Sequence, residues 1–263
     1  MFIQHDDVLQ LPLSTWRSRA VGYAVNVYLV RGALVDTGFE AVRGALARLV
    51  DERRPRGAFV THWHEDHAGN VALLARRGVP LGMSAATEAA VREVPRIPFY
   101  RRFTWDQMRP LAGPIEPFAP DDLQLLAAPG HSPDHHVVWD ASTRTLFAGD
   151  LYLGVKVRVM HAAEDPATIV ASLRAVRALR PARLFCAHRG LVADPASALD
   201  AKIEWLEGTI AAIERRIDAG WDDAAIAHEV LGPEDLTGFV SRGEYSRRNV
   251  VRAVRRARAR DEG

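Results

Sequence analysis

Histidine and aspartate side chains are concentrated in one short segment of this 263-residue chain. Residues 61–69 read Thr-His-Trp-His-Glu-Asp-His-Ala-Gly and follow a short apolar run that is typical of a buried strand. His62 and His64 are two positions apart, so in extended backbone their side chains point to the same side. Asp66 and His67 come where the pattern predicts a turn into a helix. Because zinc favours neutral imidazole and carboxylate ligands, this spacing predicts a metal site.

Three further candidate ligands each stand directly after a short apolar run. His131 lies in Pro-Gly-His-Ser-Pro, Asp150 ends Leu-Phe-Ala-Gly-Asp, and His188 follows Leu-Phe-Cys-Ala. Sites in α/β proteins tend to form where strands leave a sheet, so we expect these side chains to gather at one edge with the first four. The complete set would contain seven ligands, which is enough for two metals with open coordination positions.

A pair of divalent metals would define the chemistry of such a site. Metals of this kind lower the pKa of bound water from about 15.7 toward about 7 and so generate a nucleophile near neutral pH. They also polarise a carbonyl or phosphoryl oxygen and stabilise the anion that forms. The sequence therefore indicates hydrolysis of an ester, thioester, lactone, amide or phosphodiester. Zinc is the first expectation from the ligand types, and iron or manganese accept the same ligands.

The elements that must position these side chains alternate between strand and helix in the first part of the chain. Helical periodicity predicts helices at residues 40–53, 66–77 and 166–180, and apolar runs predict short strands at 24–30, 33–35, 58–60, 122–128, 136–140, 144–148 and 184–187. After about residue 195 the pattern is wholly helical. We therefore expect an α/β catalytic domain over residues 1–195 and a C-terminal helical extension over residues 196–263.

Residues 94–120 interrupt this order with six prolines and a cluster of aromatic residues, Phe99, Tyr100, Phe103 and Trp105. The segment looks irregular and lies between the motif that ends at His67 and the one that starts at Gly130. We therefore expect a lid whose aromatic side chains line the substrate pocket, and the alternative is a satellite core under a long loop. Lys156 is a further candidate for the pocket, where it could meet an anionic group, although a surface position suits it equally well.

The composition is that of an ordinary globular protein, with 48% hydrophobic and 25% charged residues. No apolar run approaches the roughly 18–20 residues that span a membrane, the first residues do not resemble a signal peptide, and the lone Cys186 cannot form an internal disulfide. We therefore expect a cytoplasmic protein with no membrane partner. The net charge of +1 conceals a basic end, since residues 241–263 carry eight arginines against three acidic residues. We expect these arginines on the solvated face of a packed helix, with nucleic-acid contact as the less favoured alternative.

Together these motifs resemble the metallo-β-lactamase superfamily over roughly residues 20–190. His-x-His-x-Asp-His, Gly-His-Ser-Pro, Phe-Ala-Gly-Asp and Cys-Ala-His occur in the order that the family has. The resemblance implies an αββα sandwich with the metals at one edge. It is closest to glyoxalase II-like and lactonase-like members that combine this body with C-terminal helices.

The resemblance also implies a role for each candidate residue. One metal would be held by His62, His64 and His131, and the other by Asp66, His67 and His188. Asp150 would lie between the two metals, so Asp66 and Asp150 are the residues that it implicates in catalysis. Asp36, in an Asp-Thr-Gly sequence like the first motif of the family, would support the ligands from behind.

One position departs from the pattern of these members, which read Gly-His-Thr/Ser-Pro-Gly-His. Asp134 stands in the place of the second glycine. Because aspartate tolerates left-handed backbone better than most residues, we expect the turn to survive. His135 matches the second histidine of the pattern, and we expect it to act as a structural hydrogen-bonding group rather than a ligand.

The function most consistent with these observations is that of a binuclear metal-dependent hydrolase, which uses a metal-bridging hydroxide on a small-molecule thioester, ester or lactone. One alternative is a nuclease of the same fold that cleaves single-stranded RNA, which the basic end favours. A further alternative is a mononuclear iron sulfur dioxygenase, against which the seven-ligand set argues. Residues 151–158 do not match the glycine-containing stretch that glyoxalase II enzymes use near glutathione. The sequence leaves open the substrate, the metal, and whether the chain is a monomer or a homodimer.

Overall fold

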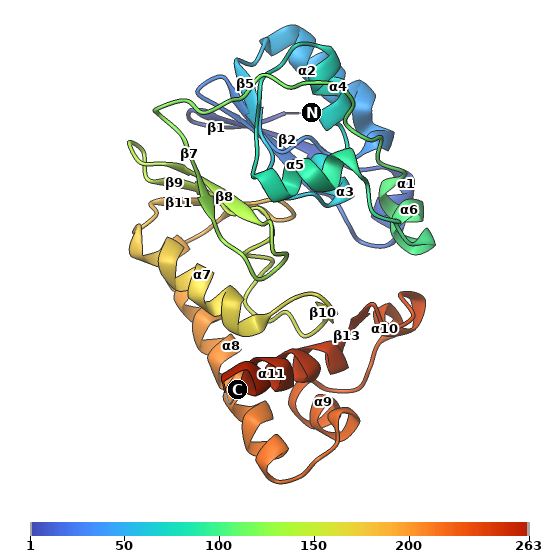
Figure 1. Cartoon of the computed structure of the whole chain (residues 1–263). Helices are drawn as coiled ribbons and strands as arrows, with labels where there is room; N and C mark the ends of the chain where they lie inside the picture. Colours follow the sequence, from blue (N-terminus) through green and yellow to red (C-terminus); the bar gives the residue numbers. More distant parts are fainter. Residues whose placement is uncertain (1, 262–263) are drawn as a thin grey trace. The chain divides into compact units, whose positions relative to one another are not determined.

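The structure is a computed structural model that describes residues 2–261. The chain divides into two compact units. The first unit contains the residues up to 127 together with 134–150 and 182–193, and the second contains 128–133, 151–181 and the residues from 194 onward. Figure 1 labels helices and strands of both units.

The first unit contains a mixed six-stranded sheet in the order β1-β2-β3-β4-β5-β6. Its strands are β1 (Ile3–His5), β2 (Val8–Leu13), β3 (Val25–Val30), β4 (Ala33–Val35), β5 (Gly57–Phe59) and β6 (Leu81–Gly82). The first four pair antiparallel, and β5 and β6 extend the sheet in parallel. Strands β2, β3 and β4 are buried on both faces, which explains why they are apolar almost throughout instead of alternating.

A second mixed sheet, in the order β12-β11-β9-β8-β7, completes the strands of the first unit. Its strands are β7 (Gln124–Ala127), β8 (His136–Asp140), β9 (Thr145–Phe147), β11 (Arg183–Cys186) and β12 (Gly190–Val192). Aromatic rings fill the space between the two sheets. The ring centroid of Tyr28 lies 5.3 Å from that of Phe147 and 5.2 Å from that of Phe185. This shared core makes the two sheets a sandwich, as expected.

Short helices flank the six-stranded sheet: α1 (Trp16–Ala20), η1 (Glu40–Val42), α2 (Arg43–Arg53), α3 (Glu65–Ala68), α4 (Val71–Arg76), α5 (Ala85–Arg92) and α6 (Phe99–Trp105). Leu46 and Leu49 of α2 and Leu74 of α4 join the core cluster that contains Leu11 and Val27 of the sheet. These two helices therefore bury their apolar sides against the strands.

The sequence prediction for this part was wrong at two places. The stretch 94–120 was expected to be irregular, but it contains the helix α6, in which the Thr104 hydroxyl donates to the Tyr100 carbonyl. The single helix expected at 66–77 is two helices, α3 and α4, which break at Gly69. A Cβ at Gly69 would lie 2.3 Å from the Glu65 carbonyl oxygen and 2.7 Å from the Cα of Phe39, so this close approach requires glycine.

The second unit is mainly helical. It contains α7 (Pro166–Ala178), α8 (Pro195–Asp218), α9 (Asp223–Leu231), α10 (Leu236–Val240), α11 (Arg247–Asp261) and a two-stranded ribbon of β10 (Met160–His161) and β13 (Tyr245–Ser246). Aspartate side chains cap the first turns of four of these helices, at Asp165, Asp194, Asp222 and Asp235. The predicted C-terminal helical region is therefore confirmed. The predicted boundary near residue 195 stays a prediction, and α7 belongs to the same compact unit as α8.

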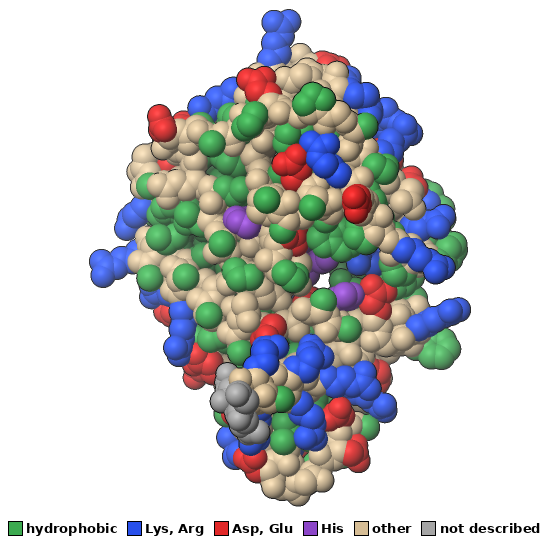
Figure 2. All heavy atoms as spheres, viewed as in Figure 1, with side chains coloured by type: hydrophobic (Ala, Val, Ile, Leu, Met, Phe, Trp, Pro, Cys, Tyr) green, Lys and Arg blue, Asp and Glu red, His purple; other side chains and the backbone are tan. Residues whose placement is uncertain are grey.

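The basic end of the chain forms helix α11, as expected. Val250, Ala253 and Val254 are buried along one side of it. Its arginines are largely paired with acidic side chains of the second unit: Arg252 and Arg255 with Asp223, Arg258 with Asp218, Arg260 with Asp165 and Arg247 with Asp235. Basic and acidic side chains lie close together on the visible face of this part (Figure 2). Among the described helices, none is both long and apolar enough to cross a membrane.

An ion pair between Arg31, in the turn after β3, and Asp140, at the end of β8, gives the first unit a predictable response to acid. The carboxylate of Asp140 is fully buried, and Arg31 Nε donates to it over 2.7 Å. Burial alone would raise the pKa of Asp140, but hydrogen bonds from Arg31, Ser142 and Thr143 outweigh this and lower the pKa to about 2. Since the pKa is lower in the folded state than in the unfolded state, the stabilisation is present above pH ~4 and is lost as the pH falls through ~2.

We therefore expect Asp140→Asn to lower the free energy of unfolding by about 2 kcal/mol at pH 6, after allowing for the partial exposure of Arg31. The difference from the wild type should shrink progressively below pH ~4. Urea denaturation at a series of pH values between 6 and 3 measures it. A difference that stays constant over this range would show that the charge of Asp140 does not stabilise the fold.

Candidate metal centre

The metal-binding motif begins where β5 leaves the six-stranded sheet. Thr61 anchors this point, since its amide and its hydroxyl both donate to the Asp36 carboxylate over 2.9 Å. His67 Nδ1 is 2.8 Å from the other oxygen of Asp36. Asp36 is 2% exposed and therefore fixes both ends of the motif from inside the fold. The resemblance to the superfamily implies a supporting role for Asp36 behind the candidate ligands, and that role stays a prediction.

Two aspartates and two histidines converge within the first unit. His67 Nε2 lies 3.3 Å from Asp150 Oδ1 and 3.6 Å from Asp66 Oδ2. His188 Nε2 lies 3.3 Å from the same two oxygens. These four residues come from α3 and from the ends of β9 and β11, so the sandwich brings together side chains that are up to about 120 positions apart in the sequence.

The donor set of this cluster fits divalent metals. His62, His67 and Asp150 form one group whose ligand atoms all lie within 4.8 Å of one another, and Asp66, His67 and His188 form another. His67 Nε2 is buried and makes no hydrogen bond to the described residues, although both carboxylates face it. Imidazole nitrogens and carboxylate oxygens converging at this spacing are the ligands of zinc and related transition metals.

Hydrogen bonds at the far side of each ring aim the histidines. His67 uses Nδ1 for Asp36, and His188 Nδ1 lies 2.6 Å from the carbonyl oxygen of Ala24. Because Nδ1 of each ring is engaged in this way, Nε2 points toward the cluster. Metal-ligating histidines usually have this arrangement.

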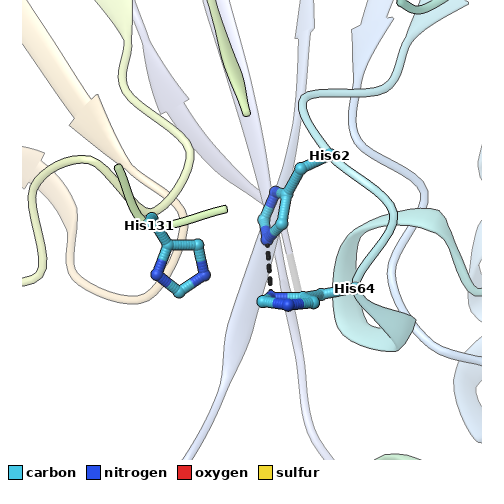
Figure 3. A group of neighbouring side chains, drawn as sticks. All are labelled: His62, His64 and His131. Carbon is cyan, nitrogen blue, oxygen red and sulfur yellow. Dashed lines mark hydrogen bonds between the residues drawn. The ribbon is translucent and has the colours of Figure 1, made fainter. Parts of the chain in front are cut away.

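His62 and His64 lie next to each other at the same end of the sheet, with 2.9 Å between His62 Nε2 and His64 Nδ1 (Figure 3). Figure 3 also labels His131, which the resemblance to the superfamily implies as a ligand of the same metal as His62 and His64. His131 belongs to the second unit, where its Nδ1 lies 3.2 Å from Glu164 Oε1. Its ring is therefore oriented by a carboxylate, as are those of many metal ligands.

Mutual attraction dominates the electrostatics of the cluster. Burial alone would lower the pKa of His67 and His188, but Asp150 and Asp66 outweigh it and raise both values well above the usual range. Burial alone would raise the pKa of the two aspartates, yet the two histidines hold the pKa of Asp66 below its usual value and that of Asp150 well below it. Metal ligands must be deprotonated, so a bound divalent cation would take the place of the protons on these rings.

His135 contacts the backbone at Asp150. Its Nε2 accepts a hydrogen bond from the Asp150 amide over 3.0 Å, which fixes the backbone of a predicted ligand. The preceding Gly149 has φ of 51°, and a Cβ there would lie 2.7 Å from the same His135 nitrogen. Only glycine therefore fits this turn without displacing the ring.

The predicted pocket residues lie in different environments. Phe99 is 78% exposed and Phe103 is 38% exposed on α6, whereas Trp105 is buried in the main core. The Trp105 ring packs 5.0 Å from Phe39 and lies 6.1 Å from the ring of His188, measured between centroids. Tyr100 is half-buried on α6, and Lys156 is exposed in the second unit. Trp105 is thus a core residue beside a predicted ligand. That the other predicted residues line a substrate pocket stays a proposal.

Sequence reasoning missed a buried ion pair within the motif. Glu65 is fully buried, and Arg101 of α6 donates to it through two nitrogens, at 2.7 and 2.5 Å. The guanidinium also lies 5.7 Å from the centroid of the Trp63 ring. Burial raises the pKa of Glu65 even though Arg101 opposes this shift. The only signal in the sequence was a charged residue, Glu65, directly after an apolar run and among the candidate ligands. Its partner Arg101, 36 positions away, could not be predicted from the sequence.

Comparisons with known proteins agree with this geometry. The family model of the metallo-beta-lactamase superfamily matches residues 20–188, so the chain belongs to the metallo-β-lactamase superfamily. Metallo-hydrolases belong to this superfamily, and the His/Asp groups described above imply divalent metal cofactors. The fold is the mixed-sheet sandwich of that superfamily followed by a C-terminal helical region.

Among relatives, the chain is 27% identical over 199 residues to "Beta-lactamase-like protein 2 homolog" of Caenorhabditis elegans, which is 68% of this chain and 60% of the worm protein. It is 28% identical over 162 residues to "Probable metallo-hydrolase YybB" of Bacillus subtilis (strain 168), covering 57% of this chain and 67% of that protein. The chain thus spans about three fifths of the worm relative's length.

Solved structures share the fold at low sequence identity. A metallo-beta-lactamase family protein from Thermus thermophilus has a TM-score of 0.67 at 18% identity, over 95% of this chain and 92% of that chain. The metallo-beta-lactamase FIM-1 from Pseudomonas aeruginosa, in its mono-zinc form, has a TM-score of 0.60 at 18% identity, over 79% and 95%.

The Glu65–Arg101 pair yields a stability prediction. Arg101→Met leaves a buried carboxylate without its guanidinium, and we expect the free energy of unfolding to fall by about 3–5 kcal/mol. Arg77→Met is the matched control, since it removes an exposed pair with Asp51 and should cost under about 1 kcal/mol. Denaturant unfolding of both variants at neutral pH measures the difference. Similar small losses in the two variants would contradict a stabilising role for the buried pair.

Proposed function

We propose that this chain is a binuclear metal-dependent hydrolase that cleaves a small-molecule thioester, ester or lactone. The observation that supports this most directly is the convergence of His67 and His188, each oriented by a hydrogen bond behind its ring, on the buried carboxylates of Asp66 and Asp150. Such preorganised donors suit hydrolysis, in which charge develops on an oxygen of the substrate.

Under this proposal the metals would be held in the first unit by His62, His64, Asp66, His67, Asp150 and His188, with Asp150 as the shared carboxylate. His131, which belongs to the second unit, stays a ligand that the sequence predicts. The metals would supply an activated water and polarise the scissile bond. Zinc is the favoured metal from the ligand types, and iron and manganese accept the same ligands. In the first unit His67 belongs to both donor groups, and its Nε2 can bind only one metal, so the carboxylate of Asp150 is the group that we propose to be shared.

The remaining residues of the site maintain this geometry. Asp36 holds the ring of His67, the Ala24 carbonyl holds that of His188, and His135 holds the backbone of Asp150. Displacement of a reacting group by about 1 Å can cost roughly 10²-fold in rate. These supporting contacts are therefore expected to matter for turnover as well as for metal binding.

The alternatives receive less support. Cleavage of single-stranded RNA would draw on free positive charge for phosphate contacts, but arginines of α11 are paired with acidic side chains. A mononuclear iron sulfur dioxygenase would leave part of the seven-ligand set unused. The names of the two relatives, which refer to a β-lactamase-like protein and a metallo-hydrolase, are in line with hydrolysis. A cytoplasmic location and a monomeric or homodimeric state remain part of the proposal.

Metal analysis combined with a substrate panel tests the function. Reconstituted protein should hold close to two transition-metal ions per chain and hydrolyse a member of a thioester, ester and lactone panel faster than it cleaves single-stranded RNA. Protein stripped with a chelator should lose this activity and regain it when metal is restored. A metal content that stays at one after reconstitution would argue against the binuclear centre, and cleavage of RNA alone would favour the nuclease.

Asp150→Ala should remove most of the hydrolytic activity while leaving the chain folded. Its carboxylate is the group expected between the two metals, so its loss disturbs their spacing and should lower kcat by at least about 10²-fold. Circular dichroism and metal analysis serve as controls. Turnover equal to that of the wild type, with both metals bound, would refute this role.

The proposed pocket wall can be tested at Phe103. Phe103→Ala should raise KM about three- to tenfold for a good substrate and leave kcat and metal content unchanged, because it removes apolar contact area away from the metals. Phe2→Ala is a matched control. Phe103 is 38% exposed with Arg17 5.9 Å from its ring, and Phe2 is 37% exposed with Arg53 5.9 Å from its ring. Equal KM values in the two variants would show that α6 does not line the substrate pocket.

A further inference from the structure

We infer that Asp134 is a positioning residue that fixes the backbone of His62, one of the metal ligands in the proposed function on which this inference rests. Asp134 is 5% exposed and lies in the turn that leads into β8. Its Oδ2 accepts a hydrogen bond from the Trp63 amide over 2.9 Å and another from the Thr87 hydroxyl over 2.9 Å. One carboxylate oxygen therefore ties the metal-binding loop to helix α5.

The contact to Trp63 is one of two hydrogen bonds that hold the backbone on either side of His62. On the other side, the His136 amide donates to the Thr61 carbonyl over 2.8 Å. The Thr61 carbonyl and the Trp63 amide belong to the two peptide planes that flank the Cα of His62, and the angle between those planes is set by φ and ψ of that residue. Fixing both planes from one segment, residues 134–136, therefore fixes the direction in which the His62 side chain leaves the backbone.

The anchor at the other end of this contact is rigid. Thr87 is fully buried in the first turn of α5, where its amide donates to Ser84 Oγ over 3.0 Å. The two hydroxyls of Thr87 and Ser84 are 2.8 Å apart. Since Thr87 has one hydroxyl proton and gives it to Asp134, Ser84 donates to Thr87. This chain of bonds holds the Asp134 carboxylate against a helix N-terminus that is itself capped.

The backbone at Asp134 explains why its side chain matters. Asp134 stands where the related motif has glycine, but it is not among the described residues that have a positive φ. The turn therefore does not use the conformational freedom of glycine at this position, contrary to the expectation of a left-handed residue. What aspartate adds is the acceptor for Trp63 and Thr87, which glycine lacks.

Substitution at Asp134 should weaken metal binding more than it weakens the fold. Removing a partner that orients a ligand typically costs about 10- to 100-fold in metal affinity, and we expect this loss for Asp134→Ala and Asp134→Gly. Asp134→Asn retains an oxygen that can accept both hydrogen bonds, so its zinc affinity should stay within about threefold of the wild type.

Asp140→Ala is the matched control. Asp140 is also a buried aspartate, at the end of β8, and it accepts hydrogen bonds from Arg31 and Ser142 rather than from the metal-binding loop. Its loss should destabilise the metal-free protein at least as much as Asp134→Ala does, but it should leave the zinc affinity within about threefold of the wild type.

The experiment measures three quantities on the full chain: the zinc dissociation constant by chelator competition, the visible absorption spectrum of the cobalt-substituted protein, and denaturant unfolding of the metal-free protein. The inference predicts weaker zinc binding and an altered cobalt spectrum for the Ala and Gly variants, with both restored in Asp134→Asn. Wild-type zinc affinity in a folded Asp134→Ala protein would overturn it. So would an Asp134→Asn protein as impaired as Asp134→Ala, since the charge and not the hydrogen bonds would then matter.

If Asp134→Ala does not fold, Thr87→Val tests the same contact. It removes the anchoring donor and keeps the side-chain shape, and it should weaken zinc binding several-fold. Unchanged zinc affinity in that variant would overturn the inference. These outcomes are distinct from failure of the proposed function: a wild-type protein that binds no zinc contradicts both, whereas wild-type binding that is insensitive to residue 134 contradicts only the positioning role.

Discussion

The buried carboxylate of Asp36 is the contact on which the metal-binding motif depends. It accepts hydrogen bonds from the amide and hydroxyl of Thr61 and lies 2.8 Å from Nδ1 of His67. Thr61 begins the loop that carries His62 and His64, and His67 belongs to α3, so a single side chain at the end of β4 sets both halves of the motif. Aspartate is among the residues that tolerate the left-handed backbone found there, with φ of 64°.

A second set of hydrogen bonds joins the two sheets at the edge that carries His188. The hydroxyl of Tyr28 donates to the Cys186 carbonyl over 2.6 Å, and the Asn26 side chain donates to the Ala187 carbonyl over 2.8 Å. His188 continues this series with its contact to the Ala24 carbonyl. Strand β3 of one sheet therefore positions the end of β11 in the other, which brings His188, a candidate ligand, close to α3.

The buried charges of the first unit serve different ends. Asp140 and Glu65 are each paired with a guanidinium, and their contribution is to the fold. The carboxylates of Asp66 and Asp150 face imidazoles instead. Metal ligands must be deprotonated and close together, so this arrangement is the one expected for groups that would hold a divalent cation. The contacts behind the rings prepare the site for that cation before it binds.

The sequence by itself determined the parts of this protein that depend on residue type and short spacing. The His-x-His-x-Asp-His segment, the candidate ligands that follow apolar runs and the helices of the C-terminal region can be predicted from local patterns. The order of the motifs indicated the superfamily. Only the tertiary structure decided that Arg101 neutralises Glu65, that Asp134 holds the Trp63 amide and that Trp105 is buried. Each of these contacts joins positions 36 or more residues apart or places a side chain in a shared core. Sheet packing sets such distances, and local periodicity carries no information about them.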